Sequence, residues 1–132
     1  MGVYGGTVQD QYVPYIRPQE NGNKAEVRWA TLTDAQGIGL LVIGLPLLNV
    51  SAHHYSTEDL TWAMHAHELH RRKETYLNLD YRQGGLGSNS CGPRPLPQYL
   101  LMPEPMSFRV RLRPFSAGDS PWSLSRSGPC DA

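Results

Sequence analysis

The residues GIGLLVIGLPLLNVSAHH, 37–54, are the most apolar part of the chain and are expected to supply its core. The uninterrupted apolar run, Gly37 to Leu48, has 12 residues, well short of the roughly 20 that a membrane-spanning helix needs. The residues after it alternate as LNVSAHHY, which is typical of a strand. Because Pro46 cannot donate a hydrogen bond to a neighbouring strand, we expect two separate strands here, Gly37 to Gly44 and Leu47 to His54.

The length and the charge of the chain limit its class. With 132 residues it is expected to form one domain around a single hydrophobic core. Lysine plus arginine and aspartate plus glutamate both total 12, so the formal charge is zero and neither a nucleic acid nor a membrane is predicted as a partner. The first ten residues, MGVYGGTVQD, contain no basic segment followed by an apolar one. We therefore expect no secretory signal and a cytoplasmic location.

Further strands are predicted where apolar and polar residues alternate. They are Glu26 to Thr33, Thr75 to Tyr81 and Ser107 to Phe115. In the first of them, Val27, Trp29 and Ala30 are expected to face the core and Arg28 the solvent. In the last, one face is expected to be wet because it carries three arginines, Arg109, Arg111 and Arg113.

The N-terminal region predicts less regular structure. Gln11 to Ile16, QYVPYI, has aromatic and β-branched residues around Pro14, which indicates an edge or irregular strand. The following residues 18–24, PQENGNK, predict a turn with Asn21 and Gly22 at its corner.

One segment, STEDLTWAMHAHELHRRKE at residues 56–74, predicts a helix from Thr57 to His70. Ser56 is expected to cap it together with Asp59, and the basic residues 71–73 favour its C-terminal end. A stripe of residues is expected to lie against the sheet. Its members are Leu60, Ala63, Met64 and His67.

The histidines of this segment follow the pattern H-x-H-x-x-H, at positions 65, 67 and 70. On a helix with about 100° per residue, His65 and His67 point to nearly opposite sides, and only His67 and His70 approach each other. Glu68 is expected to face elsewhere. We therefore predict a structural or solvated role for these side chains, and a transition-metal site is the less favoured alternative.

Hydrolytic chemistry on sugars needs two facing carboxylates, and the sequence pairs none. The acidic residues considered lie in a turn, on the predicted helix and at a strand end: Glu20, Glu58, Asp59, Glu68 and Asp80. Cys91 has no Cys–His signature beside it, so a packing role is predicted. We expect no disulfide between Cys91 and Cys130 in a reducing compartment.

The residues GGLGSNSCGPRPLPQY, 84–99, predict a shaped loop. Its glycines allow backbone angles closed to other residues, and Ser88, Asn89 and Ser90 can form local hydrogen bonds. Prolines at positions 93, 95 and 97 hold the chain extended after Cys91.

Two motifs carry a resemblance to a known family. They are P-x-E-N-G, at Pro18, Glu20, Asn21 and Gly22, and G-x-G-S-N-S-C-G-P, from Gly85 to Pro93. The chain resembles the C-terminal part of the small-chain domain, domain five, of family-two β-galactosidases. The resemblance covers residues 9–115 and leaves residues 1–8 as an N-terminal tail. Residues 116–132, which have no periodicity and are rich in Ser, Gly and Pro, are expected to be a disordered tail without regular structure.

The resemblance implies a mainly β fold, half of a galactose-mutarotase-like antiparallel β-sandwich with one short helix. It implies a fragment or subunit of an enzyme that hydrolyses terminal β-D-galactosides such as lactose. The catalytic glutamates and the magnesium and sodium sites of that enzyme are expected outside this chain, on a catalytic barrel. The remainder of the enzyme is the expected partner, in an oligomer. Half of a sandwich is also expected to expose apolar surface that a partner covers.

The resemblance further implies that a loop of this chain reaches the substrate pocket. The residues assigned to that pocket loop are Ser88, Asn89, Ser90, Cys91 and Gly92. The position of Cys91 faces the departing sugar in the family and holds a tryptophan in some members, so weaker binding of that sugar is expected here.

Two other interpretations stay open at this point. One is a free-standing carbohydrate-binding module that stacks sugars on tyrosine and tryptophan rings. The other is a non-functional remnant of a broken gene, which would not fold.

Overall fold

The computed structural model describes residues 2–85, 89 and 91–128, which belong to two compact units. Unit 1 comprises Met1–Lys24 and Asn49–Leu101, and unit 2 comprises Ala25–Leu48 and Met102–Ala132. Among the described residues no helix is long and apolar enough to cross a bilayer. The cytoplasmic location stays a prediction.

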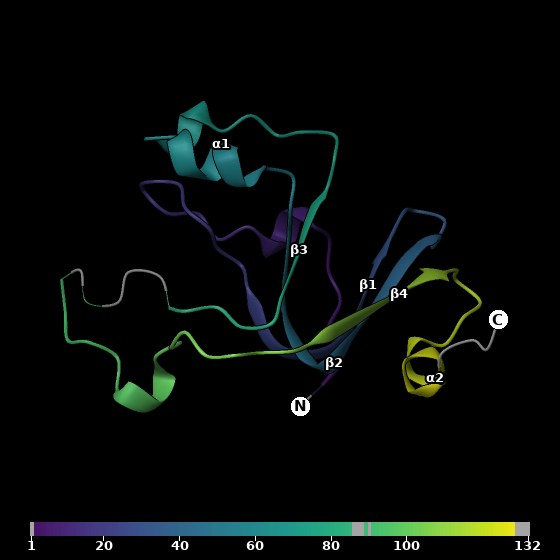
Figure 1. The fold of residues 1–132 in the computed structure, drawn as a ribbon. Coiled ribbons are helices and arrows are strands. Elements are labelled where there is room, and N and C mark those ends of the chain that lie inside the picture. The colour runs from purple at the N-terminus through teal and green to yellow at the C-terminus, as the bar shows by residue number, and fades with distance from the viewer. Residues whose placement is uncertain (1, 86–88, 90, 129–132) are drawn as a thin grey trace. The chain divides into compact units, whose positions relative to one another are not determined.

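β2 (Gly39–His53) is hydrogen-bonded to every other strand of the described chain (Figure 1). Its first part pairs antiparallel with β4 (Arg109–Phe115), from Gly39 opposite Phe115 to Leu45 opposite Arg109. Its last part pairs antiparallel with β3 (Tyr76–Asp80), from Asn49 opposite Asp80 to His53 opposite Tyr76. β1 (Lys24–Thr33) completes the set.

The prediction of two separate strands in residues 37–54 is wrong, because β2 runs through Pro46 without a break. The Leu45–Pro46 peptide bond is cis. The pairing with β4 ends at Leu45 and the pairing with β3 begins at Asn49, so Pro46 lies between the two ladders. A proline is tolerated there because neither ladder needs a donor from it.

The other strand predictions are confirmed. β1, β3 and β4 fall within one or two residues of their predicted ranges, and in β1 Val27, Trp29 and Ala30 are half-buried while Arg28 is exposed. The described chain has four strands instead of about six, and two short α-helices instead of one. A mainly antiparallel β fold is therefore confirmed, and the β-sandwich stays a prediction.

The core lies along β2. In unit 2 the fully buried side chains of this strand are Leu41, Val42, Ile43 and Leu48. In unit 1, Val50 of β2 is buried, as are Leu60 and Ala63 from the residues after it. Consecutive residues 41–44 are all buried, so both faces of the strand are covered at this point.

The predicted helix over residues 57–70 is wrong in its length. α1 spans only Thr57–Trp62, and a single 3-10 turn follows at Ala66–Glu68. The predicted cap is confirmed, since Ser56 and Asp59 bond reciprocally to each other's backbone. The helix ends because the Glu68 carboxylate accepts the Met64 N–H at 2.8 Å, which takes the donor that would continue it.

The C-terminal part of the predicted stripe fails for the same reason. Leu60 and Ala63 are buried as expected, but Met64 is 51% exposed and His67 is exposed. Arg72 does not extend a helix. It turns back and donates two hydrogen bonds to Asp59, at 2.6 and 2.8 Å.

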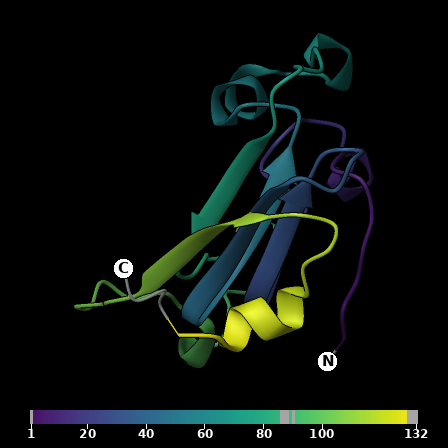
Figure 2. The ribbon, with the colours of Figure 1, turned by 90° about the vertical axis from the view of Figure 1, so that its right-hand side faces the viewer.

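The prediction that the arginine face of β4 is exposed to solvent is wrong for two of its three arginines. Arg111 and Arg113 are partly buried, whereas Leu112 is 55% exposed. The tail beyond residue 115, predicted without regular structure, contains α2 (Pro121–Arg126) in the same unit (Figure 2). Arg111 donates to the carbonyls of Ser127 and Gly128, and Arg113 donates to the Ser127 hydroxyl. These carbonyls lie beyond the C-terminal end of a helix, where cations are favoured.

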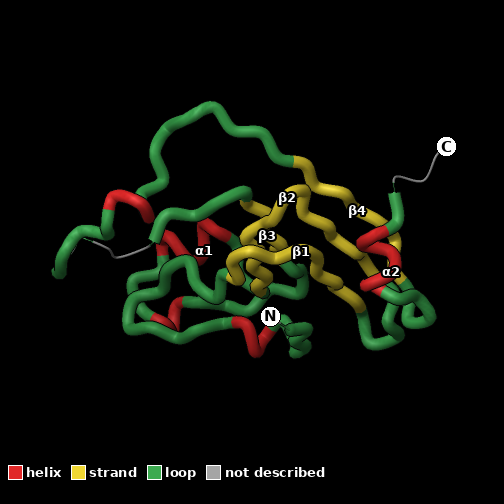
Figure 3. Tube along the Cα trace, turned by 90° about the horizontal axis from the view of Figure 1, so that it is seen from below, coloured by secondary structure: helices red, strands yellow, loops and turns green. Residues whose placement is uncertain are grey.

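The predicted edge strand at residues 11–16 is wrong as well. A 3-10 turn at Gln9–Gln11 leads into irregular chain, and Val13 donates its N–H to the Asn21 side chain instead of to a strand. Figure 3 shows how much of the chain is loop, including the long connection from β3 to β4.

The ion pair between Asp59 and Arg72 is expected to stabilise the fold in a way that depends on pH. Its hydrogen bonds, with the Ser56 backbone N–H, hold the pKa of Asp59 well below its usual range. A lowered carboxyl pKa stabilises the fold above the unfolded value of about 4 and loses that effect as the pH falls below it. We expect Arg72→Gln to lower the midpoint of thermal unfolding at pH 7 and to flatten the loss of stability below pH 4. Arg71→Gln, at an exposed neighbour, is the matched control, and equal effects of both variants would contradict the assignment.

Candidate functional site

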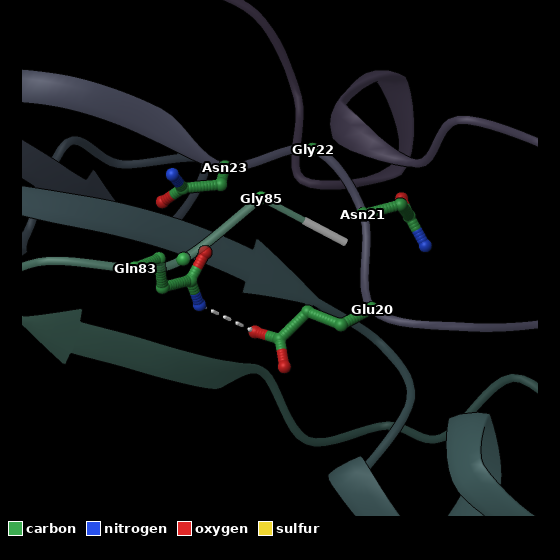
Figure 4. A pocket seen from close by; sticks show the side chains of 7 residues that line it. Glu20, Asn21, Gly22, Asn23, Gln83 and Gly85 are labelled. Carbon is green, nitrogen blue, oxygen red and sulfur yellow. Dashed lines mark hydrogen bonds between the residues drawn. The ribbon is translucent and has the colours of Figure 1, made fainter. Parts of the chain in front are cut away.

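A pocket of about 240 Å³ lies in unit 1, between the turn that precedes β1 and the residues that follow β3 (Figure 4). Its lining residues are Glu20, Asn21, Gly22, Asn23, Gln83, Gly84 and Gly85. Pockets that enclose a whole drug-sized ligand are typically about 300–1,000 Å³, so this one is of a size to hold part of a ligand.

Asn21 organises one wall of the pocket through both ends of its side chain. Its Oδ1 accepts the N–H of Val13 at 2.8 Å, and its Nδ2 donates to the carbonyl of Gln19 at 2.9 Å. In Figure 4 this side chain points away from Gln83, toward its own loop. The turn is therefore held in shape by side-chain bonds where regular structure is absent.

His53, at the end of β2, holds the same turn in place with a hydrogen bond. Its Nε2 lies 2.8 Å from the carbonyl oxygen of Asn21, and a carbonyl only accepts, so Nε2 carries the proton. The side chain is 2% exposed and contacts Tyr12 edge to face. Its Nδ1 is buried and has no hydrogen-bond partner among the described residues. A central strand thus anchors the pocket wall through one imidazole.

Gly22 is required by the shape of this wall. Its φ is +69°, in the left-handed region that glycine adopts freely. A Cβ at this position would lie against the Gln11 carbonyl oxygen, closer than the 3.0 Å that real Cβ atoms respect, and 3.1 Å from the His53 ring. The corner predicted at Asn21 and Gly22 is confirmed as a place where the chain needs glycine.

Gln83 joins the two walls. Its Nε2 donates to Glu20 Oε1 at 3.2 Å (Figure 4) and to Asp80 Oδ2 at 3.1 Å. Asp80 is the last residue of β3, so the strand end and the turn before β1 are linked by one amide. Lys24 Nζ donates to the Gly22 carbonyl at 2.5 Å, and burial lowers the pKa of its ammonium group.

The chemistry of the lining is polar and mostly neutral. Among the seven lining residues Glu20 is the one carboxylate, beside three amides and three glycines. Glycosidases of either stereochemistry require two carboxylates at a defined separation. This set of residues is suited to hydrogen-bond a polar ligand.

The assignment of residues 88–92 to a substrate pocket stays a prediction, and Asn89, Cys91 and Gly92 are not among the described residues that line the pocket of unit 1. Ser88 and Ser90 lie outside the described residues, as does Cys130. Asn89, with φ +69°, Cys91 and Gly92 are described and exposed. Gly84 and Gly85, at the start of the same loop, do line it.

Sequence reasoning missed the role of Glu20, Asn21, Asn23 and Gln83. A signal was present, because Glu20 and Asn21 belong to the P-x-E-N-G motif. The structure brings this motif to one side of the pocket and the start of the second motif, Gly85, to the other, although more than 60 residues separate them.

The prediction that His65 and His67 point to opposite sides is wrong. Both residues follow the end of α1, and their rings are stacked with centroids 5.4 Å apart. Glu68 does not face elsewhere, because its Oε1 lies 3.0 Å from His65 Nδ1.

A comparison with known proteins identifies a family whose matching region contains both motifs. The family described as Beta galactosidase small chain matches residues 1–112 of the chain. The chain belongs to this family. Among curated relatives, the small-chain domain is 38% identical to a β-galactosidase of Priestia megaterium over 102 residues, which are 76% of this chain and 10% of that protein.

Two further relatives are similar to the small-chain domain over most of its length. A β-galactosidase of Arthrobacter sp. (strain B7) is 32% identical over 86% of this chain and 12% of its own length. A β-galactosidase of Bifidobacterium adolescentis is 34% identical over 87% of this chain and 11% of its own length. The small-chain domain therefore spans about a tenth of the length of these relatives.

Gly22→Ala tests the pocket wall. The substitution forces a strained φ and a clash with the Gln11 carbonyl, so we expect the free energy of unfolding to fall by about 1–3 kcal/mol. Gly84→Ala is the matched control, since a Cβ on this other lining glycine meets nothing within 4 Å. Urea denaturation of both variants measures the difference, and a Gly22→Ala chain as stable as Gly84→Ala would refute the role given to Gly22.

Proposed function

We propose that the chain serves as a non-catalytic part of an enzyme that hydrolyses terminal β-D-galactosides such as lactose. The observation that carries the proposal is the pocket where the two family motifs meet, lined by hydrogen-bonding groups and a single carboxylate. Such a lining can orient a sugar and leaves the bond cleavage to residues elsewhere.

The loop that begins at the pocket is proposed to complete the substrate site of the catalytic part. Its proposed contact residues are Ser88, Asn89, Ser90, Cys91 and Gly92. The exposure of Asn89, Cys91 and Gly92 supports this, because they are free to contact another chain or domain. Gly84 and Gly92 have open space around them, which leaves room for that contact.

The remainder of a β-galactosidase is the proposed partner. The connection between β3 and β4 exposes a series of large apolar side chains, all at least 38% exposed: Leu96, Tyr99, Leu100, Leu101, Met102, Met106 and Phe108. Large areas of exposed apolar surface mark interaction sites. An oligomer of the complete enzyme is part of the same proposal.

In the proposed mechanism this chain supplies orientation and the partner supplies the reaction. One carboxylate of the partner attacks the anomeric carbon while a carboxylic acid of the partner gives its proton to the leaving oxygen. We propose that the magnesium and sodium ions expected in the family are bound outside this chain, because the one group of three candidate metal ligands in the described residues includes two imidazoles, whereas these ions prefer oxygen. Their sites are proposed to lie on the partner.

A carbohydrate-binding module is the second candidate. The observation that favours it is the exposure of aromatic rings able to stack on a sugar, above all Trp62, which is 78% exposed. This candidate requires that the chain alone binds galactosides, which the first proposal does not require.

A complementation assay distinguishes the non-catalytic part of an enzyme from the carbohydrate-binding module. We would assay a chromogenic β-galactoside with the purified chain alone, with a β-galactosidase truncated to remove the matching region, and with the mixture. Activity confined to the mixture supports the proposal. If the folded chain gives no activity in the mixture, the proposal is wrong, and isothermal titration with galactose and lactose then tests the binding module.

Cys91→Trp tests the pocket loop within that active mixture. An indole at this position adds an aromatic platform for the departing sugar, so we expect tighter binding of glucose and a larger share of transglycosylation over hydrolysis. Cys91→Ser, which changes the side chain without adding a ring, is the control. An unchanged product ratio with Cys91→Trp would argue against placing Cys91 in the substrate pocket.

A further inference from the structure

The residues after α1 form a cluster of metal-ligating side chains that the proposed function does not use. Because the helix ends at Trp62, His65 and His67 do not follow helical spacing, and their rings lie nearly parallel, 19° apart in plane. One ligand atom from each of His65, His67 and Glu68 lies within 4.8 Å of the others. This is the one such group among the described residues.

Glu68 is held in place before any ion arrives. Its Oε2 accepts the Met64 N–H at 2.8 Å, and its Oε1 lies 3.0 Å from His65 Nδ1. The bond to His65 and the bond to Met64 also lower the pKa of this carboxyl. A carboxylate fixed by a backbone donor is the kind of supported ligand seen in protein metal sites.

We propose that His65, His67 and Glu68 bind one divalent transition-metal ion such as Zn²⁺. Two imidazole nitrogens and one carboxylate oxygen are a donor set that suits zinc, nickel or copper and is poorly suited to Mg²⁺ or Ca²⁺, which prefer oxygen.

The geometry requires little rearrangement. Ligand atoms about 2.0–2.1 Å from a tetrahedral zinc ion lie roughly 3.4 Å from one another. The present separations of up to 4.8 Å close to that value by rotation of the exposed imidazoles of His65 and His67, while the backbone N–H of Met64 keeps Glu68 in place. The same exposure leaves the fourth position to water.

The ion would act on the turn that follows α1. Its three ligands lie within four residues, between the end of α1 and Arg72, whose side chain bonds back to Asp59 near the helix start. A bound ion therefore fixes the path of the chain from α1 back toward its own N-terminus. The inference is independent of the galactosidase proposal, because the cluster shares no residue with the pocket.

The test uses the purified chain after removal of metals with a chelator. Isothermal titration with ZnCl₂ is expected to show one equivalent bound, and Zn²⁺ but not Mg²⁺ is expected to raise the midpoint of thermal unfolding. His65→Gln, His67→Gln and Glu68→Gln are each expected to weaken the binding of Zn²⁺ at least tenfold.

His70→Gln is the matched control, since His70 is an exposed histidine of the same segment outside the cluster. It is expected to bind Zn²⁺ like the unsubstituted chain. Circular dichroism of each variant without metal checks that the fold is retained. Absence of zinc binding by the folded chain overturns the proposal. So does a loss in His70→Gln equal to that in His65→Gln, which would indicate the helical pairing of His67 with His70.

Discussion

The burial of β2 on both faces is the constraint on which the rest of the structure depends. A strand with four consecutive buried residues has to be covered on either side, and its backbone groups have to be bonded along its length. β1, β3 and β4 meet that second requirement by pairing with it. His53, the last residue of β2, connects this buried strand to the pocket wall, because its side chain forms a hydrogen bond with the Asn21 carbonyl.

Outside the strands, polar side chains form hydrogen bonds with backbone groups that have no partner in a β-ladder. Asn21 satisfies a backbone donor of residue 13, Glu68 ends α1, and Arg111 bonds the carbonyls that follow α2. Each of these contacts replaces a hydrogen bond that regular structure would make. Loops of this kind have defined shapes, which is why one of them can form a pocket wall.

The pocket and the exposed apolar side chains are the two features on which the proposed function draws. The pocket has a volume of about 240 Å³ and one carboxylate among its lining residues, and the connection between β3 and β4 carries several exposed apolar side chains. The proposed role as part of a larger enzyme accounts for both, since the relatives carry this region as about a tenth of a much longer protein. The metal site proposed at His65, His67 and Glu68 is independent of that account.

The sequence by itself determined three of the four strands, the Ser56 cap and the family, because alternation, capping chemistry and dense motifs act over a few neighbouring residues. It also marked Asn21 and Gly22 as a corner. Tertiary structure decided that β2 continues through Pro46, since only the positions of β3 and β4 show that no donor is needed there. It likewise decided where α1 ends and thus that His65, His67 and Glu68 gather, and it decided that Gln83 joins Glu20 across 63 positions. These outcomes depend on which distant group takes a given hydrogen bond, and periodicity along the chain carries no information about that.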